Sequence, residues 1–300
     1  MKSMSVFSKL SYRKKESNKY DYGHVLIIAG SRGMAGAGVL AARAALRTGI
    51  GLVTVGSISS AWKAMLNAVP EAMALPLKES RNGIITGNNY KKVVEYILSR
   101  KVNAVAVGPG LRTARGSQMF VTNILKSKQI GSMPLVIDAD GINVLPVGLK
   151  YLASREGVSV ITPHLGEYQR LTGEQKLDTR TVEQHAKLFA REHKIVCVIK
   201  KNKTFVTDGM RVYRNTTGNP GMATAGAGDV LTGIITAMLS MAAGVSVSNK
   251  VLTGNDVFDI VTSAVYLHGM AGDIAAGKLT QNSVTASDIV ESIPLAWKRV

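Results

Sequence analysis

The stretch that decides the fold and function of this chain is Asn215-Thr216-Thr217-Gly218-Asn219-Pro220-Gly221-Met222-Ala223-Thr224-Ala225-Gly226-Ala227-Gly228-Asp229. Its last small residues lead directly into an apolar helical pattern that begins at Val230. The free backbone N–H groups of such a loop and the positive end of the helix dipole together stabilise negative charge that develops during a reaction. The stretch therefore predicts an anion-binding site at the start of a helix.

Asp229 is the unusual member of this stretch, because a carboxylate in the first helical turn would repel a bound phosphate. The arrangement fits a reaction in which Asp229 takes the proton of an attacking hydroxyl. The amides of Gly226, Ala227 and Gly228 would then hold the transferring phosphoryl group. These residues predict phosphoryl transfer to an alcohol, although Asp229 as a plain charge at a helix N-terminus stays open here.

Outward from this stretch, short apolar runs alternate with helical patterns. The apolar runs lie at 25–29, 52–55, 104–107, 135–137, 158–161 and 195–199. The helical patterns lie at 36–48, 88–100, 118–127 and 181–193. Continuous apolar strands separated by helices predict an α/β fold, a three-layer sandwich whose mostly parallel sheet is covered on both faces. A polar hairpin is expected at 203–214, and the remainder of the chain reads as helical.

The length of 300 residues and the hydrophobic content of 46% allow one large domain. We expect a single catalytic domain at 21–300, preceded at 1–20 by a basic arm or a leading helix. The run from Val230 to Val247 is only moderately apolar and is expected to be a buried helix, not a membrane span. The first 20 residues contain no apolar segment of a secretory signal, and the lone Cys197 excludes an internal disulfide. We therefore expect a cytoplasmic protein.

The net charge of +17, from 37 Lys and Arg against 20 Asp and Glu, permits nucleic acid or phosphorylated metabolites as partners. The basic residues are spread along the chain, and aromatic residues make up only 5% of it. Because single-strand platforms interleave basic and aromatic side chains, a nucleic-acid-binding protein is the less favoured alternative. A dinucleotide-binding motif fits poorly at 36–41, because its glycines begin too far from the preceding strand. A P-loop motif fits poorly at 272–278, because Leu279 stands where Ser or Thr is required.

Further candidate residues follow the predicted strands, where ligands of an open parallel sheet bind. Asp138, Asp140 and Asn143 follow the strand at 135–137 and are able to hold Mg²⁺ through water or to cap a helix. Gly110 lies in Gly108-Pro109-Gly110, which is either a ligand-binding loop or a tight turn. His164, followed by Glu167, is oddly placed for a core histidine, and we expect it to contact a ligand.

Gly226-Ala227-Gly228-Asp229 resembles the GxGD anion hole of the ribokinase-like superfamily. The longer string 217–224 is similar to the signature of the ADP/ATP-dependent NAD(P)H-hydrate dehydratases. Further matches occur in the family's order at 22–26, 36–37, 46–55, 107–110, 138–143, 162–167 and 267–273. The resemblance covers about residues 20 to 295, and the ordered matches are specific when taken together.

The resemblance implies repair of hydrated NADH and NADPH (NADHX and NADPHX). Phosphate from ADP or ATP passes to the ring hydroxyl and is then lost, which releases AMP or ADP, phosphate and the restored NADH or NADPH. Mg²⁺ is implied, with no metal ligand assigned. By position, the hydrated dinucleotide would contact Ala37, Gly110, His164 and Asp229. The adenine nucleotide would contact Lys200, Lys201, Asn202, Lys203, Thr204 and Gly228. Asn219 is a further candidate.

This chain departs from the family pattern at several places. Lys201 stands where the family usually has Gly, Ala225 and Ala227 replace Gly and Thr before Gly228, and the segment 242–256 is longer than usual. The fused epimerase domain has no room in 300 residues, so a separate epimerase is expected. A homo-oligomer, specifically a tetramer, is also implied. A ribokinase-like kinase of a vitamin-precursor alcohol shares the same base and anion hole and is the alternative enzyme. The preference between ADP and ATP, and between NADHX and NADPHX, is not readable.

Overall fold

The computed structural model describes residues 2–245 and 252–300. Its strands are β1 (His24–Ile28), β2 (Leu52–Ile58), β3 (Met73–Leu77), β4 (Ala104–Val107), β5 (Leu135–Ile137), β6 (Ser159–Ile161), β7 (Ile195–Ile199), β8 (Phe205–Thr207) and β9 (Val212–Arg214). They form one sheet in the order β3-β2-β1-β4-β5-β6-β7-β8-β9. Strands β1 to β7 are parallel, and β8 and β9 are added as an antiparallel hairpin. The predicted sheet and hairpin are confirmed.

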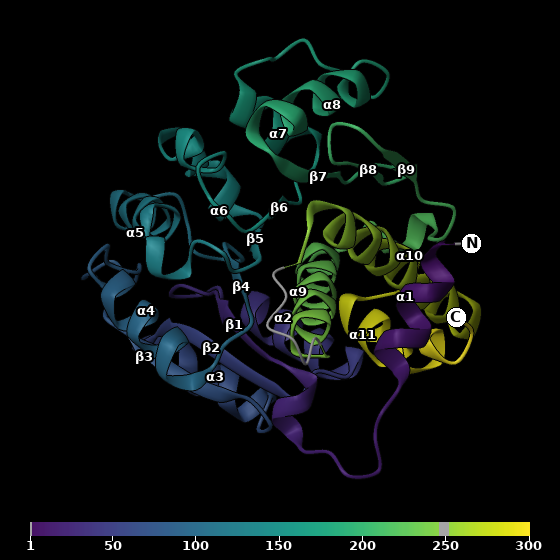
Figure 1. Cartoon of the computed structure of the whole chain (residues 1–300), viewed down its shortest axis with the longest axis horizontal. Helices are drawn as coiled ribbons and strands as arrows, with labels where there is room; N and C mark the ends of the chain where they lie inside the picture. The colour runs from purple at the N-terminus through teal and green to yellow at the C-terminus, as the bar shows by residue number, and fades with distance from the viewer. Residues whose placement is uncertain (1, 246–251) are drawn as a thin grey trace.

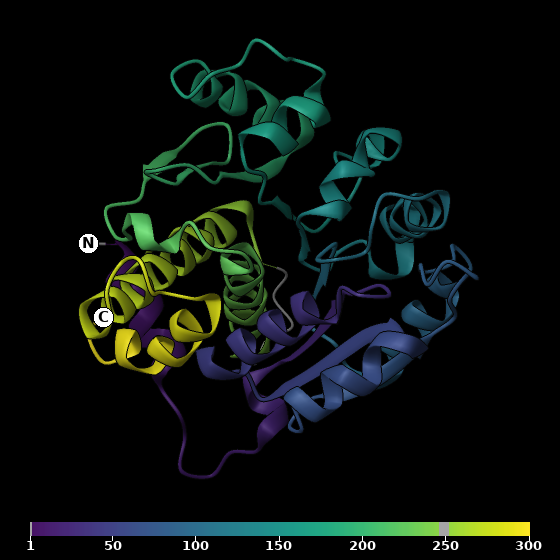
Figure 2. The ribbon, with the colours of Figure 1, turned by 180° about the vertical axis from the view of Figure 1, so that it is seen from behind.

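The α-helices are α1 (Lys2–Ser11), α2 (Ala35–Thr48), α3 (Ser59–Ala68), α4 (Asn89–Arg100), α5 (Arg115–Lys126), α6 (Asp140–Asn143), α7 (Leu165–Thr172), α8 (Val182–His193), α9 (Ala227–Val245), α10 (Gly254–Lys278) and α11 (Ala286–Trp297). Short 3₁₀ turns are η1 (Lys19–Tyr22), η2 (Lys128–Ile130), η3 (Leu145–Val147), η4 (Leu149–Tyr151) and η5 (Pro220–Met222). Figures 1 and 2 show α4, α5, α7 and α8 along one side of the curved sheet and α2, α9, α10 and α11 on the other. The three-layer arrangement is as predicted.

Helix α9 is the central helix of the fold and packs on β1, β4 and β5 as well as on α2 and α10. The stretch Ala227–Gly244 is long and apolar enough to cross a membrane, but 72% of it is buried inside the protein. That burial fits the expected core helix. The extra length expected at 242–256 falls partly on 246–251, which lie outside the described residues.

The chain before β1 is not a free arm. Helix α1 buries Phe7 and Leu10 in the common core, and the Phe7 ring meets the Trp297 ring edge to face at 5.4 Å. The sequence left open a basic arm or a leading helix before the domain, and the structure contains the helix. The boundary at residue 20 remains a prediction.

The elements that the sequence did not single out include β3, α3 and α7. Strand β3 lies at the edge of the sheet, where Met73 is 37% exposed and Pro76 occurs in the strand. Proline is tolerated on an edge strand because its missing N–H is not needed there. The mixed exposure of β3 removes the continuous apolar run by which the interior strands were found.

Candidate active site

The loops that leave β1, β4, β5 and β6 all lie at the carboxyl edge of the sheet, because these strands are parallel. Helix α9 begins at the same edge and carries Asp229 in its first turn. Burial raises the pKa of Asp229 to about 7, and the carboxylates of Asp138, Glu167 and Asp140 act in the same direction. Lys200 opposes them. A carboxyl with this pKa is poised to accept a proton near neutral pH.

Free amides lie beside Asp229, as the sequence predicts. Among the hydrogen bonds of residues 2–245 and 252–300, the backbone N–H groups of Gly226, Gly228 and Asp229 have no acceptor. Ala227 N–H is less available, because it donates to the Thr224 carbonyl at 3.4 Å. A Cβ added to Gly228 would lie 3.1 Å from Lys200 Nζ. Glycine therefore leaves room for a phosphoryl group between the amides and the Lys200 ammonium. Asp229 N–H is an anion donor that the sequence analysis did not assign.

Asp138 is the buried anchor of the site, with only 1% of its surface exposed. Its Oδ1 accepts from Thr162 Oγ1 at 2.7 Å and from Lys200 Nζ at 2.8 Å, and its Oδ2 accepts from Thr232 Oγ1 at 2.7 Å. Three loops and α9 are joined through this carboxylate. These three hydrogen bonds use most of the acceptor capacity of the carboxylate and give Asp138 a positioning role.

Lys200 lies between the carboxylates of the site. Its Nζ is 2.8 Å from Asp138 Oδ1 and 3.9 Å from Glu167 Oε2. Burial acts to lower the pKa of the Lys200 ammonium, but the two carboxylates outweigh burial and hold that pKa above its ordinary value. Lys200 therefore carries a positive charge next to Gly228, where a transferring phosphoryl group would need one.

His164 caps helix α7 and keeps its side chain 53% exposed. Its Nδ1 accepts from Gly166 N–H at 3.1 Å and from Glu167 N–H at 3.3 Å, while Glu167 Oε2 accepts from His164 N–H at 2.9 Å. The capping box fixes the tautomer that has its proton on Nε2. His164 Nε2 lies 3.5 Å from Glu167 Oε1, and the exposed part of the ring leaves room for a ligand; the ligand contact itself stays a prediction.

Ala37 and Gly110 lie side by side, although they are far apart in the sequence. Gly110 has φ +65°, and a Cβ there would lie 2.9 Å from the Met34 carbonyl oxygen and 3.2 Å from Ala37 Cβ. Gly30 N–H also donates to the Pro109 carbonyl at 2.8 Å, which joins the β1–α2 and β4–α5 loops. The two predicted dinucleotide contacts thus share one wall of the site.

Asp140 and Asn143 hold neighbouring loops in place. Asp140 Oδ2 accepts from Arg112 N–H at 2.7 Å, and Asn143 Oδ1 accepts from Arg170 Nε at 3.0 Å. Asp140 also contributes to the raised pKa of Asp229. Neither Arg112 nor Arg170 was singled out by the sequence analysis.

Asn219 stabilises the loop before α9. Its Oδ1 accepts from Gly221 N–H at 3.0 Å, and its Nδ2 donates to Asp273 Oδ1 at 2.9 Å. Asp273 Oδ2 accepts from Gly218 N–H at 2.8 Å. Asp273 was quoted only within the motif 267–273, and its role in clamping this loop was missed because it depends on a pairing across 55 positions.

His268 was also missed. Burial and, to a smaller extent, the Lys200 charge lower the pKa of His268 to about 4, although a hydrogen bond with the backbone of Ala227 acts in the opposite direction. His268 is therefore neutral near pH 7. It is a half-buried neighbour of the amides at the start of α9.

The predicted nucleotide segment 200–204 follows β7, but its two lysines diverge. Lys200 turns toward Asp138, whereas Lys201 Nζ donates to Glu183 Oε1 at 2.6 Å and to the Thr179 carbonyl at 3.0 Å. The Lys201 side chain is thus committed to helix α8. Asn202 and Lys203 are exposed.

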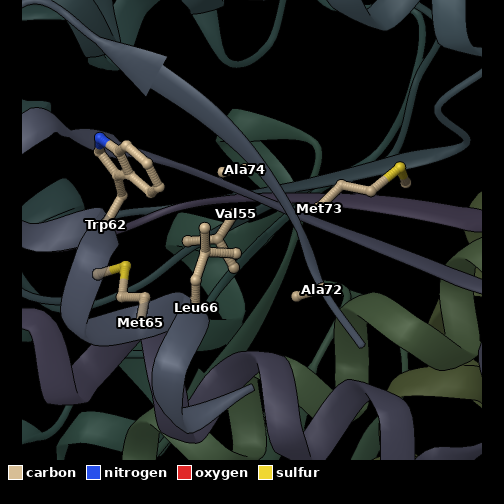
Figure 3. Close-up of a pocket in the computed structure, with 7 residues that line it drawn as sticks. All are labelled: Val55, Trp62, Met65, Leu66, Ala72, Met73 and Ala74. Carbon is tan, nitrogen blue, oxygen red and sulfur yellow. The ribbon is translucent and has the colours of Figure 1, made fainter. Parts of the chain in front are cut away.

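A small apolar pocket lies away from these residues, where Trp62, Met65 and Leu66 of α3 face strands β2 and β3 (Figure 3). It contains no titratable side chain, so it offers no group for proton or phosphoryl transfer. The part of the chain that the structure describes also holds no cluster of three or more His, Cys, Asp or Glu side chains arranged to bind a metal ion.

A parallel sheet with an antiparallel hairpin, a helix that begins in free amides and an adjacent carboxylate together define a ribokinase-like enzyme. The chain belongs to the NAD(P)H-hydrate dehydratase family, whose model matches residues 25–295. It is 31% identical to the ADP-dependent (S)-NAD(P)H-hydrate dehydratase of Bacillus subtilis, over 98% of this chain and 96% of that protein. The predicted family and fold are confirmed.

Two further comparisons agree. The crystal structure of the Bacillus subtilis ADP/ATP-dependent NAD(P)H-hydrate dehydratase, co-crystallised with ATP and Mg²⁺, superposes with a TM-score of 0.78 at 29% identity. It covers 99% of this chain and 96% of that one. The bifunctional NAD(P)H-hydrate repair enzyme Nnr of Thermofilum pendens is 34% identical over 95% of this chain. This chain spans about half of that relative, 52% of its length.

Proposed function

We propose that this chain dehydrates NADHX and NADPHX to NADH and NADPH at the expense of ADP or ATP. The observation that carries the proposal is the position of Asp229, whose pKa is raised to about 7, beside the free amides of Gly226, Gly228 and Asp229 itself. Membership of the NAD(P)H-hydrate dehydratase family supports the same substrate and reaction class.

In the proposed mechanism, Asp229 accepts the proton of the ring hydroxyl as that oxygen attacks the terminal phosphorus of ADP or ATP. AMP or ADP leaves with the electrons of the broken P–O bond. The amides at the start of α9 and the Lys200 ammonium stabilise the charge on the transferring phosphoryl group. The ring C–O bond then breaks with phosphate as the leaving group, and a neighbouring ring carbon loses a proton. Phosphate leaves far more readily than hydroxide, which is why the nucleotide is consumed.

Mg²⁺ fits this site as an ion held mainly by nucleotide phosphates and water. Asp138 accepts three hydrogen bonds, whereas Asp140 accepts two and Glu167 one, so Asp140 and Glu167 keep more lone pairs with which to bind the hydrated ion through water. When bound, the ion would neutralise phosphate charge. The proposal also includes a homo-oligomer, specifically a tetramer, a cytoplasmic location and an epimerase supplied by a separate chain. The oligomer and the separate epimerase rest on the resemblance in sequence, and the cytoplasmic location rests on the composition with its lone cysteine.

The proposal is tested by mixing the protein with NADHX or NADPHX, Mg²⁺ and either ADP or ATP, and following the absorbance of the reduced nicotinamide. We expect absorbance to return with at least one nucleotide and to show which one is preferred. The matched control contains the substrate and Mg²⁺ without nucleotide. If neither nucleotide restores absorbance while vitamin-precursor alcohols are phosphorylated, the dehydratase proposal is wrong and the kinase alternative is right.

A further inference from the structure

Arg112 has a backbone conformation that a side chain rarely adopts. Its φ is +60°, a left-handed value that costs an L-residue about 1 kcal/mol and that glycine adopts freely. The residue lies directly after Gly110 and Leu111 in the β4–α5 loop, next to the wall formed by Gly110 and Ala37. The chain thus keeps an arginine at a position of this loop where glycine would be less strained.

The backbone of Arg112 is fixed by the site itself. Its N–H donates to Asp140 Oδ2 at 2.7 Å, and Asp140 is one of the carboxylates that raise the pKa of Asp229. The left-handed conformation is therefore part of the connection between the β4–α5 loop and the β5–α6 loop. It determines where the Arg112 side chain leaves the loop.

The guanidinium of Arg112 reaches back across the rim of the site. Its Nη2 donates to the carbonyl oxygen of Arg32 at 3.3 Å, and Arg32 N–H is in turn held by the Gly83 carbonyl at 3.0 Å. Arg32 belongs to the β1–α2 loop that precedes Ala37. The Arg112 side chain therefore contacts the backbone of the β1–α2 loop, beside the wall formed by Gly110 and Ala37.

Most of the hydrogen-bonding capacity of these guanidinium groups is unused. Within residues 2–245 and 252–300, no carboxylate pairs with Arg112, and the Arg32 guanidinium is 3.7 Å from Glu79 with 59% of its side chain exposed. Among the described residues Arg112 thus has no carboxylate partner and Arg32 has a distant one, so both guanidinium groups keep donors for an anionic ligand. A guanidinium has five donors in a planar fork that matches phosphate.

We propose that Arg112, assisted by Arg32, binds a phosphate group of the hydrated dinucleotide. This inference rests on the proposed function and deepens it. The phosphate is either the pyrophosphate common to NADHX and NADPHX or the 2′-phosphate present in NADPHX alone. A guanidinium recognises both groups in the same way. A comparison of NADHX with NADPHX distinguishes them, because only NADPHX carries the 2′-phosphate.

The test compares Arg112→Gly with Lys101→Gly. Lys101 also has a positive φ, +54°, but it ends helix α4 at the opposite, amino edge of the sheet. Each variant removes one positive charge from a left-handed position, so backbone relief and net charge are matched. Arg112→Gln keeps a long polar side chain without the charge and covers the case in which the glycine variant folds poorly.

We expect Arg112→Gly to raise KM for the dinucleotide about fivefold to tenfold, as one charge-assisted hydrogen bond at an exposed rim would. Its Tm should not fall, kcat and KM for the adenine nucleotide should stay within about twofold, and Lys101→Gly should match wild type. An increase for both substrates assigns the pyrophosphate, and an increase for NADPHX alone assigns the 2′-phosphate. Unchanged dinucleotide KM, equal increases in Arg112→Gly and Lys101→Gly, or an increase only for ADP or ATP would overturn the inference.

Fluorescence titration with NADPH and NADH gives the same comparison without turnover. The Kd of at least one of them should rise in Arg112→Gly and Arg112→Gln but not in Lys101→Gly. If wild type binds neither dinucleotide and turns over neither substrate, the proposed function itself fails. If wild type binds and turns them over while the Arg112 variants bind equally well, only this inference fails.

Discussion

The two edges of the sheet bury polar side chains in different ways. At the amino edge, where the strands begin, the His24 imidazole contacts Thr54 Oγ1 at 2.8 Å and the Arg100 carbonyl at 3.0 Å. The Arg155 guanidinium donates to the carbonyls of Ile130 and Met133. Burial lowers the pKa of His24, and it lowers that of Arg155 to about 10.

At the carboxyl edge, the buried charges face one another instead. Lys200 keeps a raised pKa because Asp138 and Glu167 outweigh burial, and Asp229 has a raised pKa because burial and the same carboxylates act on it together. The amino edge therefore uses polar groups to join structural elements. The carboxyl edge stores a coupled set of charges that a reaction can use.

The largest expected effect on activity comes from removing the charge of Asp229 at the carboxyl edge. Asp229→Asn should lower turnover of NADHX by about 100-fold to 10,000-fold, because the amide cannot accept the hydroxyl proton. Nucleotide binding and Tm should remain close to those of wild type, measured by titration and thermal melting. Turnover in Asp229→Asn that equals that of wild type would show that this carboxylate is not the base.

The next effect is on stability. Asp138→Ala should reduce the free energy of unfolding by about 3 kcal/mol, because it leaves Lys200 without its closest partner and two hydroxyls without an acceptor. Asp288→Ala is the control: it removes an exposed capping carboxylate of α11 and should cost about 1 kcal/mol. Denaturant titration measures both, and similar losses would contradict the central role of Asp138.

The smallest effect on activity is expected at Lys201, and it tests whether this side chain lies outside the nucleotide site. Lys201→Ala should change KM for ADP or ATP less than about twofold and should cost about 1 kcal/mol of stability, because its ammonium pairs with Glu183. Steady-state kinetics with varied nucleotide would measure the first quantity. A tenfold increase in that KM would instead place the Lys201 side chain on the nucleotide.

The sequence predicted the interior of the fold because buried parallel strands are continuous apolar runs. It failed at β3, where edge exposure of Met73 and the presence of Pro76 interrupt such a run. It also predicted the loop that ends at Asp229, since glycines and a helix start are local signals. These features depend on neighbours in the chain.

The missing parts of the site depend on distant pairs. Thr232 reaches Asp138 across 94 positions, and Gly218 reaches Asp273 across 55. Such pairings follow from the order of the strands, which residue types alone do not encode. Arg112 was missed for a different reason, because an arginine gives no signal of a left-handed backbone.

The most direct test of the central claim is the pH dependence of kcat/KM for NADHX between about pH 5.5 and pH 9. Asp229 must be ionised to act as the base, so kcat/KM should rise about tenfold per pH unit below pH 7 and level off above it, with the midpoint at the raised pKa of about 7. Asp229→Asn should lose this limb. A profile that is flat through pH 7, or that keeps the same limb in Asp229→Asn, would contradict the account.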